Sequence, residues 1–179
     1  MSWTLLTTGL LVLYCAIVAA GAAQDVFTRK ISNVLSVSLL VVAVAGLAVN
    51  WGPLWWEHLL AFAITLCFGI VLFSLGWMGG GDAKLFAAAA LAFTMAGLVR
   101  FVPMVLIIGG VLGLFSILLC LFGPARRRRP GAPRQGVPYG VAIAIGAVAA
   151  TLLFRPLTVF AEPEAPTRLS PHWWQSVDR

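Results

Sequence analysis

The chain has 179 residues, of which 61% are hydrophobic and only 10% are charged. A soluble domain carries about 25% charged residues, so this composition excludes a water-soluble globular protein and predicts a chain that lies mostly in lipid. The net charge of +6 does not indicate nucleic-acid binding, because Lys and Arg mainly set the orientation of a membrane chain.

Six apolar runs alternate with short polar segments, and they predict an all-α, polytopic membrane protein with about six transmembrane helices. The runs cover residues 1–23, 34–49, 59–75, 83–98, 101–122 and 137–154. The first run does not have the form of a cleavable leader, because no Lys or Arg precedes Arg29. We expect residues 1–155 to form the membrane domain, and the Pro- and Trp-containing residues 156–179 to form an extracytoplasmic tail.

Basic residues indicate how the chain is oriented in the membrane. The connections after the first, third and fifth runs hold most of them: Arg29, Lys30, Lys84, Arg126, Arg127, Arg128, Arg129 and Arg134. The other side holds Arg100, Arg155, Arg168 and Arg179. Because cytoplasmic loops are enriched in Lys and Arg, we expect the odd-numbered connections in the cytoplasm and both termini on the non-cytoplasmic side.

The connection between the third and fourth runs holds three consecutive glycines, Gly79, Gly80 and Gly81, followed directly by Asp82. Glycine is unfavourable inside a helix, so this stretch indicates a backbone that bends sharply or lets another chain approach closely. An acid at the mouth of an apolar helix is a candidate functional residue in a membrane chain. The alternative role of Asp82 is a simple helix N-cap.

A second acid, Asp25, closes the first run, and the predicted orientation places it at the same membrane face as Asp82. Alone, Asp25 has an alternative role as a helix-ending residue with an exposed ion pair to Arg29. Two carboxylates within hydrogen-bond reach share one proton, because both cannot ionise. The ionised one then takes a proton from water while the protonated one polarises a carbonyl. This aspartic-peptidase chemistry needs no metal or cofactor.

Other polar or small residues near these acids have a structural and a functional interpretation. Lys84 is expected to be an anchor at the inner membrane face, and its alternative role is a cation that tunes Asp82. Pro138, Tyr139 and Gly140 open the sixth run, where Pro is a normal helix start. They also predict a rigid corner that packs on the glycine stretch. The three cysteines, Cys15, Cys67 and Cys120, have no zinc-site spacing.

Together, three motifs resemble those of the type IV prepilin peptidases, over nearly the whole chain except the tail. Gly79-Gly80-Gly81-Asp82 fits the G-x-G-D motif, and Ala83-Lys84-Leu85 follows it. Asp25, followed by Arg29, Ile31 and Asn33, resembles the family's first motif, and Pro138-Tyr139-Gly140 resembles its Pro-Tyr/Phe-Gly segment. Ser32 stands where many relatives have Pro. The compact form is similar to the peptidases of tight-adherence pilus systems.

The resemblance implies an aspartic endopeptidase of the bacterial cytoplasmic (inner) membrane, with Asp25 and Asp82 as the catalytic pair. It implies that prepilins or pseudopilins lose their short basic leader after a glycine, at the cytoplasmic face. Larger relatives carry paired C-x-x-C motifs and also methylate the new N-terminus. This chain has no such cysteines, so we expect neither zinc binding nor methyl transfer.

Two functions from other classes are alternatives to the peptidase. Membrane acids also serve as proton relays, which would suit a proton-linked carrier, but the apolar runs contain only single hydroxyl residues such as Thr65 and Ser74. The other is a non-catalytic scaffold of a pilus or secretion assembly, which would tolerate the loss of both carboxylates.

Overall fold

The computed structural model describes residues 3–29, 31–122 and 139–161. Within these ranges the chain folds into α-helices, which confirms the predicted all-α class. The helices are α1 (Trp3–Thr28), α2 (Asn33–Val49), α3 (Trp55–Ser74), α4 (Gly80–Ala90), α5 (Met95–Phe122) and α6 (Tyr139–Leu153), followed by a short 3-10 helix, η1 (Arg155–Leu157).

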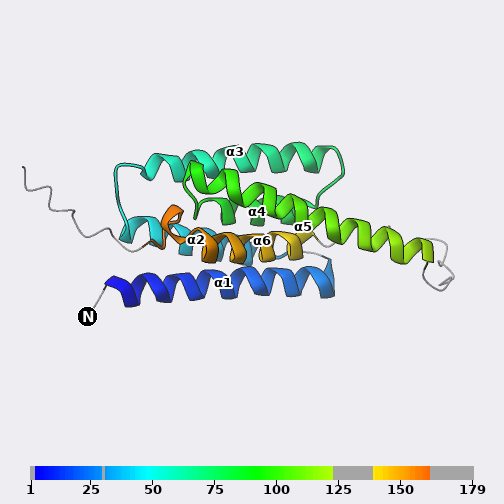
Figure 1. Cartoon of the computed structure of the whole chain (residues 1–179), viewed down its shortest axis with the longest axis horizontal. Coiled ribbons are helices and arrows are strands. Elements are labelled where there is room, and N and C mark those ends of the chain that lie inside the picture. Colours follow the sequence, from blue (N-terminus) through cyan, green and yellow to red (C-terminus); the bar gives the residue numbers. More distant parts are fainter. Residues whose placement is uncertain (1–2, 30, 123–138, 162–179) are drawn as a thin grey trace, which may run out of the picture.

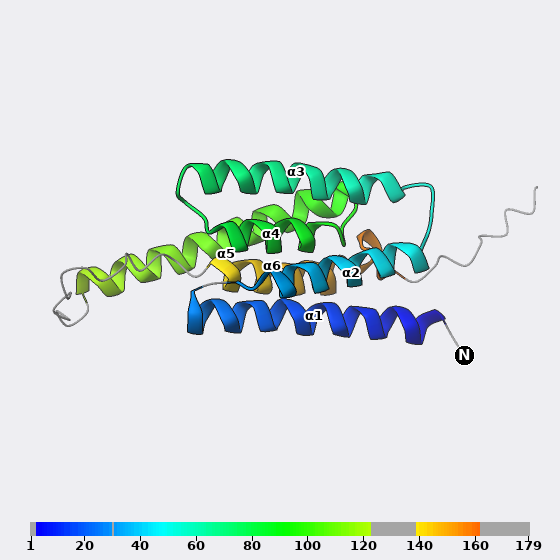
Figure 2. The same ribbon diagram turned by 180° about the vertical axis from the view of Figure 1, so that it is seen from behind.

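Successive helices run in alternating directions, so the connections gather at two ends of the bundle (Figure 1). We call one the acid end; it holds residues 25–29, 31–33 and 74–82. The other, the far end, holds residues 50–58, 91–97 and 155–160. Seen from behind, α4 again lies between α3 on one side and α2 and α6 on the other (Figure 2).

Three helices of the described chain are long and apolar enough to cross a membrane: Thr4–Thr28, Trp55–Ser74 and Met95–Leu118. The shorter helices α2 and α6 are also apolar. These helices support a membrane protein, in agreement with the composition. The predicted total of about six crossings, and the orientation of the termini, stay predictions.

Helix α4 is short and enclosed by its neighbours. Seven of its residues are buried: Ala83, Leu85, Phe86, Ala87, Ala88, Ala89 and Ala90. Small alanine side chains let α3, α2 and α6 pack closely around it. Eleven residues span roughly 16 Å, about half the thickness of a bilayer's hydrocarbon core, so α4 does not cross a membrane by itself.

The predicted fourth run, residues 83–98, is wrong in its extent. Helix α4 ends at Ala90 and α5 already begins at Met95. Between them the backbone pairs with the segment after α6: the Thr94 N–H donates to Leu157 O, and the Val159 N–H donates to Ala92 O. This long-range pairing interrupts an apolar stretch that would otherwise continue as one helix.

The chain returns to the core after α6. Val159 is 2% exposed and Phe160 is fully buried, and the Phe160 ring packs against Tyr14 of α1 with a centroid separation of 5.2 Å. The first residues beyond the predicted boundary at 155 therefore pack with the helices. Residues 162–179, the rest of the predicted tail, lie outside the described residues.

Candidate active site

Asp25 lies in the last turn of α1, because this helix continues to Thr28 rather than ending at residue 23. Arg29 follows with a left-handed backbone conformation (φ 55°), and its N–H donates to Asp25 O at 2.9 Å. A residue in this conformation commonly ends a helix. Asp25 is 5% exposed, so the helix carries the carboxylate into a buried position rather than into a polar loop.

Asp82 lies in the first turn of α4, but it is not the residue that caps this helix. Gly79 occupies the N-cap position, with extended backbone angles of φ −72° and ψ 147°. The N-cap interpretation of Asp82 is therefore wrong: Asp82 is the third helical residue, and its side chain folds back toward the backbone of Gly79. An acid in this position benefits from the free N–H groups of the helix start.

Contacts between α1 and α4 align the two acids. The Tyr14 hydroxyl donates to Ala89 O at 3.0 Å, and one or two turns further along, Gly21 lies against the Leu85 side chain. Since α1 and α4 run in opposite directions, the next turn of each helix brings Asp25 and Asp82 to the same level, at the acid end.

Asp82 has unusual electrostatic surroundings. Burial, and secondly the negative charge of Asp25, raise the pKa of the Asp82 carboxyl to about 7, while the Gly79 backbone lowers it in part. Asp82 Oδ1 is buried and has no hydrogen-bond partner. A buried carboxylate oxygen without a partner is costly, which makes this atom a candidate for contact with a substrate or water.

Asp25 is held by the start of the last helix. The Gly140 N–H donates to Asp25 Oδ2 at 2.8 Å. A Cβ atom at position 140 would lie 2.8 Å from Asp25 Cβ and 2.9 Å from Asp25 Oδ2, so only glycine fits against this carboxylate. The N–H of a residue 115 positions away thus orients the acid of α1.

The corner formed by Pro138, Tyr139 and Gly140 was expected to pack on the glycine stretch, but the contacts seen are different. Gly140 packs on Asp25, and the Tyr139 ring lies next to Gly109 of α5. Pro138 lies outside the described residues. The start of α6 therefore packs on Asp25 rather than on the glycine stretch.

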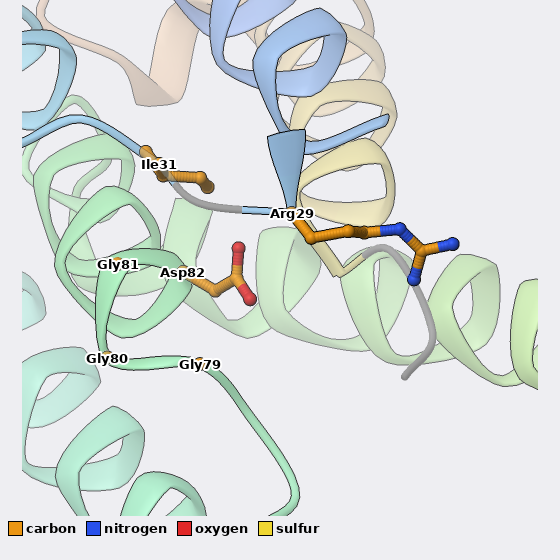
Figure 3. A pocket seen from close by; sticks show the side chains of 6 residues that line it. All are labelled: Arg29, Ile31, Gly79, Gly80, Gly81 and Asp82. Carbon is orange, nitrogen blue, oxygen red and sulfur yellow. The ribbon is translucent and has the colours of Figure 1, made fainter. Parts of the chain in front are cut away.

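A cleft of about 340 Å³ opens beside Asp82. It is lined by Arg29, Ile31, Gly79, Gly80, Gly81 and Asp82. The Asp82 carboxylate points between the glycine stretch and the α1–α2 connection, whereas the Arg29 side chain points away from it (Figure 3). Asp82 forms part of the wall of this cleft, while its Oδ1 atom is itself buried.

The glycine stretch also serves the packing of the chain itself. A Cβ atom on Gly81 would lie 3.1 Å from Ile31 Cβ and 3.2 Å from Ile31 O. The absence of a side chain at Gly81 thus lets the α1–α2 connection lie directly on the first turn of α4. Gly79 and Gly80 line the cleft and stay predicted positions for substrate approach.

Two further polar contacts join the α1–α2 connection to the helices that carry the acids. Lys84 Nζ donates to Asn33 Oδ1 at 3.0 Å, a partner that the sequence did not assign to Lys84. Gln24 Oε1 accepts the Ser32 N–H at 2.8 Å. Sequence reasoning missed Gln24, for which the only signal was its position next to Asp25.

In the described part of the chain, no group of three or more His, Cys, Asp or Glu side chains could hold a metal ion.

Two acids at one end of an apolar helical bundle, Asp25 buried and Asp82 half-buried, define a class, that of helical membrane proteins with two carboxylates at one end. Comparison with protein families narrows the class: the model of the type IV leader peptidase family matches residues 11–119, more than half of the chain. The protein belongs to the type IV leader peptidase family, which confirms the predicted family. The match contains Asp25 and Asp82 but ends before Tyr139 and Gly140. Neither the curated proteins nor the solved structures contain a match to this chain.

Proposed function

We propose that this protein is a membrane aspartic endopeptidase that removes the short basic leader from prepilin- or pseudopilin-like proteins. Asp25 and Asp82 are its catalytic pair. The observation that carries the proposal is the Asp82 carboxyl, which has a pKa of about 7 raised in part by Asp25 and an unpartnered buried oxygen beside an open cleft. Family membership supports a peptidase of this kind.

The pair acts by holding one proton between two carboxyl groups. One carboxylate takes a proton from a water molecule, and the water oxygen attacks the carbon of the scissile carbonyl. The protonated partner gives its proton to the carbonyl oxygen, and a tetrahedral diol results. Proton return to the amide nitrogen then breaks the C–N bond and leaves an acid and an amine. Because the pKa of Asp82 is about 7, the pair keeps its single proton in a large share of molecules at neutral pH.

The fold suits this substrate class. A prepilin leader is short and basic and is followed by an apolar helix, so the scissile bond lies where a helix leaves the membrane. The acid end has this position if the basic connections face the cytoplasm. We place the acid end at the cytoplasmic face of the bacterial inner membrane, in a multi-pass chain with both termini outside. The reaction requires no metal, cofactor or methyl donor.

Acid-to-amide variants test the proposal. The full-length protein is reconstituted in lipid vesicles with a peptide that joins a basic leader, a glycine and an apolar helix, and leader release is measured. We expect Asp25→Asn and Asp82→Asn to lower the rate by at least about 10³-fold, because either change removes the shared proton or its acceptor.

The matched control is Glu57→Gln at the far end. Glu57 Oε2 accepts the Met95 N–H at 3.1 Å, and an amide oxygen can accept the same bond, so this variant should cleave normally. Leader release by Asp25→Asn or Asp82→Asn at the wild-type rate would refute the dyad. Absence of leader release by the wild-type protein would instead favour the non-catalytic scaffold interpretation.

A further inference from the structure

The α1–α2 connection is attached to α1 next to the first acid. Gln24 precedes Asp25, and its Oε1 atom accepts the N–H of Ser32 at 2.8 Å. Ser32 is the N-cap residue of α2, and its own hydroxyl accepts the Val34 N–H. The last turn of α1 and the first turn of α2 are thus joined across the connection.

The same connection is attached to α4 next to the second acid. Lys84 Nζ donates to Asn33 Oδ1 at 3.0 Å, and Asn33 is the first residue of α2. The backbone of Ile31 lies directly on Gly81, so the contact between the connection and α4 is close on both sides of Asp82. Neither Asp25 nor Asp82 takes part in these bonds.

We propose that Gln24, Asn33 and Lys84 are positioning residues that fix the separation of the two carboxylates by bridging the end of α1 to the start of α4. The bridge runs from Gln24 to Ser32, along the chain to Asn33, and across to Lys84. This inference rests on the proposed function, since it assigns a role to residues around the proposed catalytic pair.

The exposure of Asn33 and Lys84 allows a positioning role to be told apart from a stabilising role. Asn33 and Lys84 are exposed at the surface, where a hydrogen bond contributes little to the free energy of unfolding. Reaction rates are far more sensitive to geometry, because a displacement of about 1 Å at reacting groups can lower a rate about 10²-fold. Removal of the bridge should therefore lower kcat in a protein that stays folded.

The first test uses Asn33→Leu, Lys84→Met and the double variant in the vesicle cleavage assay. We expect each single variant to lower kcat about tenfold with KM changed less than about twofold. The double variant should be no slower than either single one, because both changes remove the same bond. Asn33→Asp keeps an acceptor for Lys84 and should restore most of kcat.

The second test isolates the bond made by Gln24. Ser32 has φ −67°, which proline adopts without strain, and proline has no N–H to donate to Gln24. Ser32→Ala is the matched control, because it loses the same hydroxyl cap but keeps the N–H. Many relatives have Pro at this position, but in this chain the Ser32 N–H bonds Gln24, so we expect kcat of Ser32→Pro to be about tenfold below that of Ser32→Ala, with equal melting temperatures.

Two results would overturn the bridge. One is wild-type kcat for Asn33→Leu and Lys84→Met, and the other is a loss that follows the melting temperature and is not restored by Asn33→Asp. Asp82→Asn, measured in the same assay, keeps the two proposals apart. If Asp82→Asn is inactive while the bridge variants cleave normally, only the bridge is wrong; if Asp82→Asn cleaves, the dyad itself is wrong.

Discussion

The two ends of this bundle treat their polar groups differently. At the far end, polar side chains are paired with backbone groups from distant segments. Asn50 donates to Val159 O at 2.6 Å, His58 Nδ1 makes a 3.1 Å hydrogen bond with Leu91 O, and Glu57 accepts the Met95 N–H. At the acid end, Asp82 Oδ1 is buried without a partner next to an open cleft.

This difference suggests that the polar groups of the far end stabilise the fold, whereas those of the acid end serve the proposed chemistry. Satisfied buried polar groups hold segments in one arrangement, whereas an unsatisfied one lowers stability until something binds it. The polar side chains of the far end therefore hold two segments in place: the break between α4 and α5, and the segment after α6. If the acid end is the active site, as proposed, the unpartnered oxygen of Asp82 keeps hydrogen-bonding capacity free for a substrate, since unmet polar groups tend to gather at functional sites.

Among variants that keep both acids, the largest effect on cleavage is expected where the last helix, α6, touches the acid end. Gly140→Ala places a methyl group 2.8 Å from Asp25 Cβ and should displace the carboxylate, so we expect leader cleavage to fall about 10²-fold. Gly109→Ala is the control at another contact of α6, the one it makes with α5, because its Cβ would lie 3.5 Å from Ala142 Cβ, an ordinary contact. Similar cleavage rates for both variants would contradict a positioning role of Gly140.

A change at the far end should affect stability and spare the reaction. Asn50→Ala leaves Val159 O without its donor, and we expect it to lower the free energy of unfolding by about 1–3 kcal/mol, measured by thermal unfolding in detergent, with little change in kcat. Ser74→Ala is the comparison at the acid end. Its hydroxyl is exposed and donates within its own helix, to Val71 O, so a change below about 0.5 kcal/mol is expected. Equal losses of stability in the two variants would argue against the contrast between the ends.

The smallest expected effect is a gain in the free energy of unfolding, caused by Asp82→Asn, and its size depends on pH. The pKa of Asp82 is about 7 in the folded protein, above the value of about 3.9 for a free side chain. The folded state therefore binds more protons between these values, so stability falls as the pH rises from about 4 to about 7 and changes little above that. Asp82→Asn removes the buried charge, so it should raise stability at pH 8 by about 1–2 kcal/mol, discounted for partial exposure, and by less at pH 5. Thermal unfolding at both pH values checks this, and an equal effect at the two would contradict the raised pKa.

Local sequence signals were enough for some of these features. The apolar runs identified most helices, since a polar backbone in lipid must be satisfied within a helix. Alternating directions then placed Asp25 and Asp82 at the same end. The two acids were recognisable as candidate catalytic residues because acids are rare in this chain and because three glycines precede Asp82.

Features that depend on long-range contacts were not predictable. Residues 91–94 contain no glycine or proline, and their break depends on pairing with residues 157–159. The role of Gly140 depends on Asp25, 115 residues earlier. Asp25 was expected to close the first run because residues 24–28 are mostly polar, although the helix extends beyond its apolar portion to Thr28.

The hydrogen bond between Gly140 and Asp25 has a consequence for biosynthesis. Asp25 and Asp82 lie in the first half of the chain and are synthesised early. Gly140, whose N–H orients Asp25, is synthesised only with the last helix. A partly synthesised chain therefore carries the two acids without their final alignment. If Asp25 and Asp82 are the catalytic pair, as proposed, we expect cleavage of a leader to begin only after the last helix has been inserted.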